Sequence, residues 1–503
     1  MTRDVLVLGG GITGCAVARE AALRGMRVLL AEAEDLAAGT SSASTKLLHG
    51  GLRYLEYGWL SMVRESLRER EVTARLAPHL ARPLPLVVPA WDGRRPGRLA
   101  LRTAVGLYDL LAGPHPLARG RLLSTARTHA LLPDLTTEGL RGGVAFADRQ
   151  TDDARLTVEI ARAAAALGAE IRVGLRAVAL LERRGKVAGA TLEDGITGER
   201  TEVLSRFVVN ATGPWADRLR ALAGLNEPVL APSRGTHVVL HRPMPDPGVM
   251  LLGERRGRRT FVLPWRGRTL VGTTDLPERG APDAVAPTGE EVRSLLAEIA
   301  AHFPRWRTGP ESVLSAFAGV RPLLRSAAHA TLDAPRDHAV LEERGLFTLV
   351  GGKLTTWRAM AADLLDRMAG PAPPAVARAS LTRVVAEGPV AGLPPHLAAH
   401  YGARGQAVLA RAASDRDAAA PLDGEGPEIA AEVDVAVEEE FARRLTDVLL
   451  RRLPLAQDPR RCRSLAPMVA ARMRTLLGWS ARRESEEIAT LESRLHRDEA
   501  WRA

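Results

Sequence analysis

Residues 4–32 read DVLVLGGGITGCAVAREAALRGMRVLLAE, an apolar strand, a glycine turn, an alanine-rich helix and a second apolar strand. The turn carries Gly9, Gly11 and Gly14 in G-x-G-x-x-G spacing, and Glu32 ends the second strand. The three glycines permit a tight turn, close approach of a pyrophosphate, and close packing of helix on strand. A Glu32 carboxylate would accept hydrogen bonds from an adenosine ribose, and its charge disfavours a 2′-phosphate. The stretch therefore predicts a Rossmann-like domain that binds a dinucleotide at the helix N-terminus.

Three later features favour FAD over NAD as that dinucleotide. Short strand-like stretches between residues 177 and 209 form a small meander that runs into Asn210-Ala-Thr-Gly213. The pair Gly351-Gly352 stands ahead of a helix expected over 354–368. The N-terminus of that helix would face the flavin edge on which negative charge develops during reduction. Each feature alone is compatible with a structural turn, and together they indicate a flavin site.

Hydrophobic patterning divides the chain into three parts. Helix and strand alternate again over 154–173, where Asp152 or Asp153 caps the helix. Residues 235–350 instead hold short strands between Gly, Pro and Arg turns, with a hairpin turn at Trp265–Arg268. We expect an α/β chain with α+β elements: a discontinuous Rossmann-like FAD-binding domain (1–75, 150–232 and 345–370), an inserted antiparallel-sheet substrate-binding domain (76–149 and 233–344) and a C-terminal helical domain (371–503).

Composition excludes several classes of protein. The 503 residues, 46% hydrophobic and 25% charged, are ordinary for a globular chain and exclude disorder, collagen and a coiled coil. Cys15 and Cys462 are the only cysteines, so neither a disulfide framework nor a cysteine-ligated metal centre is expected, and no metal is predicted. No uncharged apolar run approaches the roughly 18 to 20 residues of a membrane span. A strand that begins by Val5 leaves no room for a signal peptide, so a reducing, cytoplasmic location is expected.

The chain is basic, and its basicity comes from arginine. Lys plus Arg number 69 against 59 Asp plus Glu, a net charge of +10 that favours anionic partners such as phosphates or acidic lipid. Only Lys46, Lys186 and Lys353 are lysines. Lysine in a chain with this bias indicates positions that need a compact ammonium.

The segment GTSSASTKLLHGGLRYLE, residues 39–56, concentrates hydroxyls, two glycines and four side chains able to do chemistry. A hydroxyl-rich cap ahead of a helix accounts for its serines and threonines. It does not account for Lys46, His49, Arg53 and Tyr54 so close to a flavin loop. We therefore predict that this segment belongs to the site.

The motifs together resemble one family. GTSSASTKLLHGGLRYLE, VVNATGPWAD, GTHVVL, FVLPWRGRTLVGTTD, AFAGVRPLL and LFTLVGGKLTTWRAMAADLLD are similar, in collinear order from residue 4 to about 368, to the FAD-dependent glycerol-3-phosphate dehydrogenases. The resemblance continues more loosely through AEVDVAVEEEFARRLTDVLLRR in the helical tail. It implies oxidation of sn-glycerol 3-phosphate to dihydroxyacetone phosphate, with a hydride passing from substrate C2 to flavin N5 and electrons going on to a membrane quinone.

The expected cofactor contacts come from these motif segments. They are Gly9, Gly11, Gly14, Glu32, Thr40, Ser41, Ser42, Lys46, Leu47, His49, Gly50, Thr212, Gly213, Trp215, Gly352, Lys353, Leu354 and Thr355.

The expected catalytic set is smaller. A dianionic phosphate needs cations, and Arg53, Arg321 and Lys353 lie in the motif segments, although a surface ion pair is the ordinary role of an arginine. Loss of hydride from C2 also requires a base for the hydroxyl proton, and histidine serves near neutral pH. His49 and His237 are both candidates, and the sequence does not choose between them. Tyr54 is a candidate to hydrogen-bond substrate, its alternative being packing.

A quinone acceptor implies attachment to a membrane surface. A proline-rich passage over 83–96 is expected to separate a helix over 60–80 from an amphipathic helix over 99–111. Segment 94–111, with Arg94, Arg95, Arg98 and Arg102 and with Arg82 just upstream, is the candidate for contact with anionic lipid. It would place the protein peripherally on the inner face of the cytoplasmic membrane. The alternative is a soluble helix packed on its own sheet. A homodimer is possible from the resemblance.

Three other activities are alternatives to the dehydrogenase. An oxidase would use the same substrate and flavin but pass electrons to O2 and give H2O2. An amino-acid or amine oxidoreductase shares the glycine motifs, but it needs a carboxylate site and has no evident use for HGGLRYLE with VGGKLTTW. A basic FAD-dependent tRNA-modifying protein is the third alternative. Its nucleic-acid partner is not expected, because the charge is spread, aromatic residues are only 4% and no known nucleic-acid module is present.

Overall fold

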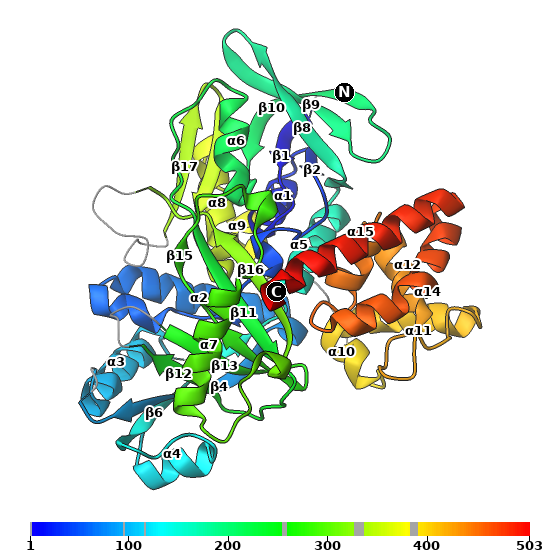
Figure 1. Cartoon of the computed structure of the whole chain (residues 1–503). Coiled ribbons are helices and arrows are strands. Elements are labelled where there is room, and N and C mark those ends of the chain that lie inside the picture. Colours follow the sequence, from blue (N-terminus) through cyan, green and yellow to red (C-terminus); the bar gives the residue numbers. More distant parts are fainter. Residues whose placement is uncertain (1–2, 94–95, 115–116, 254–258, 326–336, 383–390) are drawn as a thin grey trace.

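The computed structural model describes residues 3–93, 96–114, 117–253, 259–325, 337–382 and 391–503. Figure 1 shows two sheets, with a group of helices from the end of the chain to one side. The α/β class, with a Rossmann-like domain and a C-terminal helical domain, is confirmed.

The first sheet contains the βαβ opening. Its strands run in the order β17-β18-β10-β1-β2-β7, and β8 and β9 continue from β10 as the predicted meander. Strand β1 pairs in parallel with both β2 and β10, and its side chains from Val5 to Val7 are fully buried, as expected for a parallel strand covered on both faces. The strands are β1 (Arg3–Leu8), β2 (Val28–Glu32), β7 (Glu170–Val173), β8 (Leu175–Arg183), β9 (Lys186–Asp194), β10 (Arg200–Asn210), β17 (His338–Glu343) and β18 (Leu346–Gly351).

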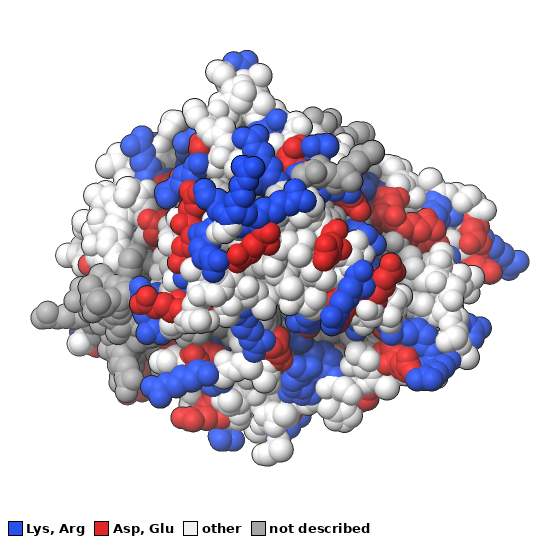
Figure 2. All heavy atoms as spheres, turned by 90° about the horizontal axis from the view of Figure 1, so that it is seen from above, with Lys and Arg blue, Asp and Glu red and all other residues white. Residues whose placement is uncertain are grey.

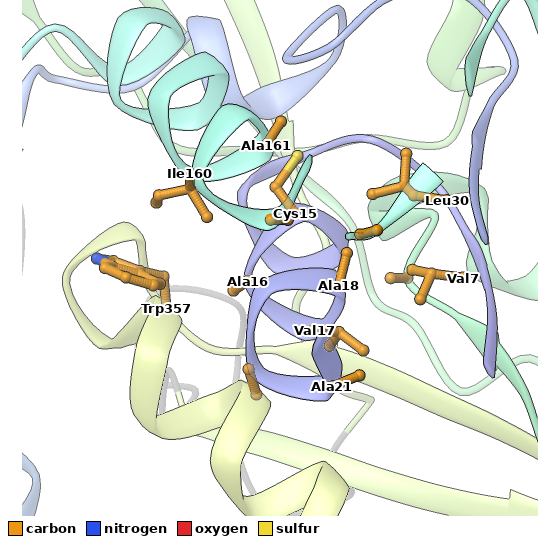
Figure 3. Close-up of a cluster of buried hydrophobic side chains, with 14 of the residues drawn as sticks. Val7, Cys15, Ala16, Val17, Ala18, Ala21, Leu30, Ile160, Ala161 and Trp357 are labelled. Carbon is orange, nitrogen blue, oxygen red and sulfur yellow. The ribbon is translucent and has the colours of Figure 1, made fainter. Parts of the chain in front are cut away.

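Helix α1 (Ile12–Leu23) lies at the centre of this domain's core. Figure 3 shows its small side chains, Cys15 to Ala18 and Ala21, among Ile160 and Ala161 of α5 (Asp153–Ala166) and Trp357 of α8 (Trp357–Ala369). Small residues let these helices approach closely, and the packing fixes the first turn of α1 at the carboxyl end of β1. Helix α6 (Ala216–Ala221) follows β10.

The second sheet is mainly antiparallel and has the order β15-β11-β14-β13-β12-β4-β6-β3, with β16 on β11 and β5 on β6. The predicted hairpin is present, since Trp265 of β13 pairs with Arg268 of β14. The strands are β3 (Leu47–Leu48), β4 (Arg82–Trp91), β5 (Arg121–Leu123), β6 (Leu140–Gln150), β11 (Ser233–Leu240), β12 (Gly248–Leu252), β13 (Arg259–Trp265), β14 (Arg268–Gly272), β15 (Leu276–Pro277) and β16 (Val313–Arg321). Its helices are α2 (Leu60–Leu76), α3 (Arg98–Leu111), α4 (Thr125–Leu131) and α7 (Gly289–His302).

Strand β4 corrects the expectation that the proline-rich passage is only a separator. It pairs antiparallel with β6 from Arg82 to Trp91. Pro83, Pro85 and Pro89 occupy alternate positions, so their missing N–H donors fall on one edge of the strand. On its other side β4 pairs with β12 only at two residues, so a regular ladder with β6 persists despite the prolines.

Two strands differ from the expected domain boundaries, because each pairs in the sheet of the other domain. Strand β17 pairs with β18 of the first sheet, and β3 pairs with β6 of the second. The chain therefore crosses between the sheets at residues 47–48, inside the segment 39–56.

The end of the chain is helical, as predicted. Helix α9 (Pro374–Thr382) contacts the first domain, where Ser380 donates to Glu20 at 2.7 Å. The remaining helices are α10 (Pro395–Tyr401), α11 (Gly405–Ser414), α12 (Ala430–Glu438), α13 (Leu445–Asp447), α14 (Pro459–Leu477) and α15 (Ala481–Glu499), and a π-helical turn over Val448–Arg452 follows α13. The expected loop over 413–427 lies between α11 and α12.

The face seen from above carries basic and acidic side chains side by side (Figure 2). Ion pairs between exposed side chains are frequent in the described structure, such as Arg344 with Glu182 at 3.0 Å and Arg200 with Glu193 at 2.7 Å. Within the described ranges, no helix is both long and apolar enough to cross a membrane.

Candidate active site

A cavity of about 720 Å³ lies where the two sheets meet. One wall consists of the carboxyl ends of β1, β2, β10 and β18 with the loops that follow them, and the other of residues from β11, β12, β13 and β16. Ligands of open α/β sheets bind beyond the carboxyl ends of the strands. The antiparallel sheet thus closes the crevice where a dinucleotide is expected.

The glycine turn leaves room for a ligand. A Cβ on Gly14 would lie 1.9 Å from the Gly9 carbonyl oxygen, and Gly9 itself has a φ of +112°. Helix α1 begins after Gly11 without a side-chain cap, and its first residues line the cavity. Among the described residues, the Ser41 Oγ accepts from the Ile12 N–H at 2.9 Å. An open helix N-terminus between glycines fits a pyrophosphate.

Glu32 lines the same end of the cavity. Its carboxylate accepts from the backbone N–H of Gly10 and, at 2.8 Å, from that of Glu34. Burial raises the pKa of Glu32 to about 7. A half-buried carboxylate that lines the cavity beside the glycine turn fits an adenosine ribose.

Most of the expected cofactor residues line this cavity. They are Gly9, Gly11, Glu32, Thr40, Ser41, Leu47, His49, Thr212, Gly213, Trp215, Gly352, Lys353, Leu354 and Thr355. A short 3-10 helix over Leu354–Thr356 leads into α8, so a helix N-terminus does lie at the cavity wall, as the Gly351-Gly352 pair predicts.

Four expected cofactor residues do not line it: Gly14, Ser42, Lys46 and Gly50. The Lys46 ammonium is buried and bonds to Asp153 of α5 and to the Ser42 carbonyl, both at 2.5 Å. It anchors the loop to the first domain, and this buried ion pair accounts for a lysine at that position. Gly14 serves the packing of α1, as predicted.

His49 lines the cavity, and a buried network behind it was not predicted. The backbone N–H of His49 donates to Thr355 at 3.1 Å, and that of Gly50 donates to the Tyr108 hydroxyl at 2.7 Å. The Tyr108 hydroxyl donates to Asp148, whose carboxylate also accepts a hydrogen bond from Arg70 at 2.6 Å. The pKa of Asp148 is raised by its burial. The only available signal was an aspartate within the apolar stretch that forms β6.

Two of the expected substrate-binding cations lie beside the ring of a third expected residue, Tyr54. Tyr54 is buried, the Lys353 ammonium lies 4.4 Å from the centre of its ring, and the Arg53 guanidinium lies 5.4 Å from it. Lys353 also donates to Ser66 at 2.8 Å. All three line the cavity, so two cations lie close together there.

Arg321 comes from the opposite wall. Its guanidinium donates to the Thr273 hydroxyl at 2.9 Å and to the Thr274 carbonyl at 3.2 Å, and it pairs with Asp275 at 3.3 Å. A Cβ on Gly235 would lie 2.3 Å from it, so only glycine allows this placement. Sequence reasoning missed Arg259, a further cavity-lining cation paired with Glu56.

His237 of β11 also lines the cavity. Its Nε2 bonds to the Thr45 hydroxyl at 2.9 Å, and its ring stacks on Phe317 at 5.0 Å between centres. Its Nδ1 is buried and has no hydrogen-bond partner among the described residues. Burial, with Arg321 and Lys46 nearby, lowers the pKa of His237 well below its usual value, so the ring is neutral.

Comparison with known proteins agrees with this geometry. Residues 4–366 match the family described as FAD dependent oxidoreductase, and residues 347–484 match the C-terminal domain of alpha-glycerophosphate oxidase. The glycerol-3-phosphate dehydrogenase of Mycobacterium leprae is 36% identical over 520 residues, which are 98% of this chain and 88% of that protein. This chain belongs to the FAD-dependent glycerol-3-phosphate dehydrogenase family. FAD is its cofactor.

Three further proteins extend the comparison. The aerobic glycerol-3-phosphate dehydrogenase of Bacillus subtilis is 36% identical over 368 residues, 73% of this chain and 66% of that protein. The structure of the Bacillus halodurans glycerol-3-phosphate dehydrogenase complexed with FAD superposes with a TM-score of 0.78 at 26% identity, covering 99% of this chain and 95% of that one. The L-alpha-glycerophosphate oxidase of Mycoplasma pneumoniae, at 21% identity and a TM-score of 0.58, shares the fold over 73% of this chain and 94% of that one.

Proposed function

We propose that this protein oxidises sn-glycerol 3-phosphate to dihydroxyacetone phosphate and passes the electrons to a membrane quinone. The observation that carries the proposal is the set of three cations, Arg53 and Lys353 on one wall and Arg321 on the other, that line the cavity into which the glycine turn of the FAD site opens. The names of the family relatives support the same substrate. FAD, when bound, supplies the acceptor for the hydride that leaves C2.

The cations bind the phosphate and orient the glycerol chain. A dianion in a partly enclosed cavity needs charge-assisted hydrogen bonds, and the fixed guanidinium of Arg321 offers them without losing much side-chain entropy. Its partners Thr273 and Asp275 hold it in place. Lys353 and Arg53, both beside the Tyr54 ring, supply the remaining positive charge.

His49 is the better candidate for the base that removes the hydroxyl proton. Both nitrogens of His237 are buried, one on Thr45, and a lowered pKa makes its ring a weak proton acceptor. Both histidines line the cavity, and His49 lies on a turn fixed by Thr355 and Tyr108. We assign the base to His49, with His237 shaping the wall behind Thr45.

Peripheral attachment to lipid rests on α3. Leu99 and Leu110 are 72% and 75% exposed, while Leu101 and Val105 of the same helix are buried. One face of α3 thus packs on the protein and the other presents large apolar side chains to solvent, as in an interfacial helix. Arg94 and Arg95 of the expected segment lie outside the described residues, and Arg82 pairs with Asp246 at 3.2 Å. A location on the inner face of the cytoplasmic membrane is part of the proposal.

Anaerobic mixing tests the function. Purified protein is combined with glycerol 3-phosphate, glycerol or an amino-acid panel while flavin absorbance is followed, and the reduced protein is then exposed to a quinone analogue or to O2. Bleaching by glycerol 3-phosphate alone, with fast re-oxidation by quinone and slow re-oxidation by O2, is expected. Fast re-oxidation by O2 with release of peroxide would make the protein an oxidase, and absence of bleaching would exclude the substrate.

A further inference from the structure

A buried ion cluster joins the C-terminal helices to the loop that follows β2. Arg452 bonds to both carboxylate oxygens of Asp35, at 2.6 and 2.9 Å, and Arg451 bonds to the same carboxylate. Asp35 and Arg452 are at most 1% exposed. Arg452 also donates to the Glu440 carbonyl at 2.8 Å, and Arg451 pairs with Asp447 at 2.9 Å. The π-helical turn over Val448–Arg452 therefore holds Asp35 from one side.

The loop that carries Asp35 walls the adenosine end of the cavity. Glu32, Ala33, Glu34 and Ala38 all line it. The Ala37 N–H donates to the Gly10 carbonyl at 3.0 Å, and the Gly10 N–H donates back to Glu32. These two hydrogen bonds join the loop to the glycine turn. A displacement of Asp35 would therefore also move the Glu32 carboxylate and the backbone expected to face the ribose of FAD.

The carboxylate of Asp35 determines where this loop lies. A buried charge is tolerated only next to its counter-charges, so Asp35 must stay with the two arginines. Although burial opposes ionisation, Arg452 and Arg451 keep the pKa of Asp35 below its usual value. No described residue after 370 lines the cavity, so the C-terminal domain acts on it only through such contacts.

We propose that the C-terminal helical domain is part of the cofactor site: Arg451 and Arg452 are positioning residues that fix Asp35, and with it the loop that receives the adenosine of FAD. The domain thereby contributes to FAD affinity without touching the flavin or the substrate. This role is independent of the proposed substrate and electron acceptor.

The test measures the affinity of the flavin-free full-length chain for FAD, ADP and FMN. Asp35→Asn should weaken FAD and ADP about tenfold or more and leave FMN within about twofold, since FMN lacks the adenosine half. Arg162→Met is the matched control. It breaks the 3.0 Å ion pair between α5 and Glu439 of the same C-terminal domain, a pair that includes none of Asp35, Arg451 and Arg452, and should change none of the three affinities.

Unchanged FAD affinity in Asp35→Asn would overturn the proposal, as would an equal loss for all three ligands, which indicates general unfolding. If Asp35→Asn does not fold, Arg451→Lys decides the matter, because it keeps the charge and loses the planar fork. The proposal then requires weaker binding of both FAD and ADP by about threefold or more. No change in Arg451→Lys would also overturn it.

Discussion

Arg321 has its partners in place before any substrate arrives. Thr273, the Thr274 carbonyl and Asp275 fix the guanidinium, and Gly235 leaves it the space. Such preorganisation lowers the entropic cost of binding an anion. Arg321→Ala should therefore raise KM for glycerol 3-phosphate about 10- to 100-fold, the value of a charged hydrogen bond, with FAD still bound. Steady-state kinetics and flavin absorbance check this, and Arg242→Ala, an exposed arginine near the end of β11, is the control. An unchanged KM removes Arg321 from the phosphate site.

Variants of the two histidines can distinguish the catalytic base from a structural residue. His49→Ala should lower kcat by roughly 10²- to 10⁴-fold, the usual contribution of a general base. His237→Gln keeps a side chain that can hydrogen-bond to Thr45 and should cost less than about tenfold. Single-turnover flavin reduction measures both variants. A larger loss in His237→Gln than in His49→Ala would reverse the assignment.

Glu32 makes cofactor affinity depend on pH. Its pKa of about 7, raised by burial, means that the flavin-free protein holds a proton there below neutral pH. Only the ionised carboxylate accepts hydrogen bonds from both ribose hydroxyls, so binding must release that proton, and affinity falls as pH drops. We expect FAD affinity to be level above about pH 8 and to fall by up to about tenfold per unit below pH 7. Fluorescence titration measures it. Glu32→Gln should bind FAD more weakly at pH 8 and remove the pH dependence, whereas a flat wild-type profile contradicts the assignment.

At the scale of elements, local patterns were predictable and long-range partners were not. Glycine spacing and apolar runs predict β1, α1, β2, the meander and the hairpin, because each depends on neighbours in sequence. Strand β4 was missed because its prolines argue against a strand unless β6 is known to lie on its paired edge. Lys46 was expected at the cofactor, and its ion pair with Asp153, 107 positions away, could not be read from the sequence.

The hydrogen bond between Tyr108 of α3 and the turn that carries His49 was also unpredictable, because its partners are far apart in the sequence. Tyr108→Phe removes the hydroxyl that joins Gly50 to Asp148 inside the protein. Loss of these buried bonds should destabilise the fold by about 1 to 3 kcal/mol. It should also lower kcat several-fold while KM and FAD content stay unchanged, because the turn behind the base is loosened.

Thermal melts and kinetics measure both effects. Tyr401→Phe is a matched control, since Tyr401 is equally buried and its hydroxyl has no hydrogen-bond partner in the part of the chain that the structure describes. It should leave both stability and kcat nearly unchanged. If Tyr108→Phe behaves like Tyr401→Phe, the network does not support the turn.

At the scale of the molecule, two sheets meet at one cavity, and helix α3 supports one of its turns from behind. The first sheet supplies the cofactor turn, the second supplies Arg321, and α3 both supports His49 through Tyr108 and exposes Leu99 and Leu110. The helix proposed to contact lipid is therefore the same helix that supports the turn carrying His49. A protein docked through α3 would keep its flavin near the bilayer, where a quinone is found.

This arrangement predicts that membrane binding and catalysis can be separated. Leu99→Ser with Leu110→Ser should reduce co-sedimentation with anionic vesicles about tenfold or more, since two exposed leucines each contribute roughly 1.5 to 3 kcal/mol when buried in lipid. Activity with a soluble dye acceptor should stay within about twofold, while activity with quinone embedded in vesicles falls with the bound fraction. Leu122→Ser, at a less exposed leucine on β5, is the control. Equal vesicle binding by the double variant and the wild type would remove α3 from the membrane contact, and equal loss with dye and quinone would mean that the substitutions disturb Tyr108 instead of the surface.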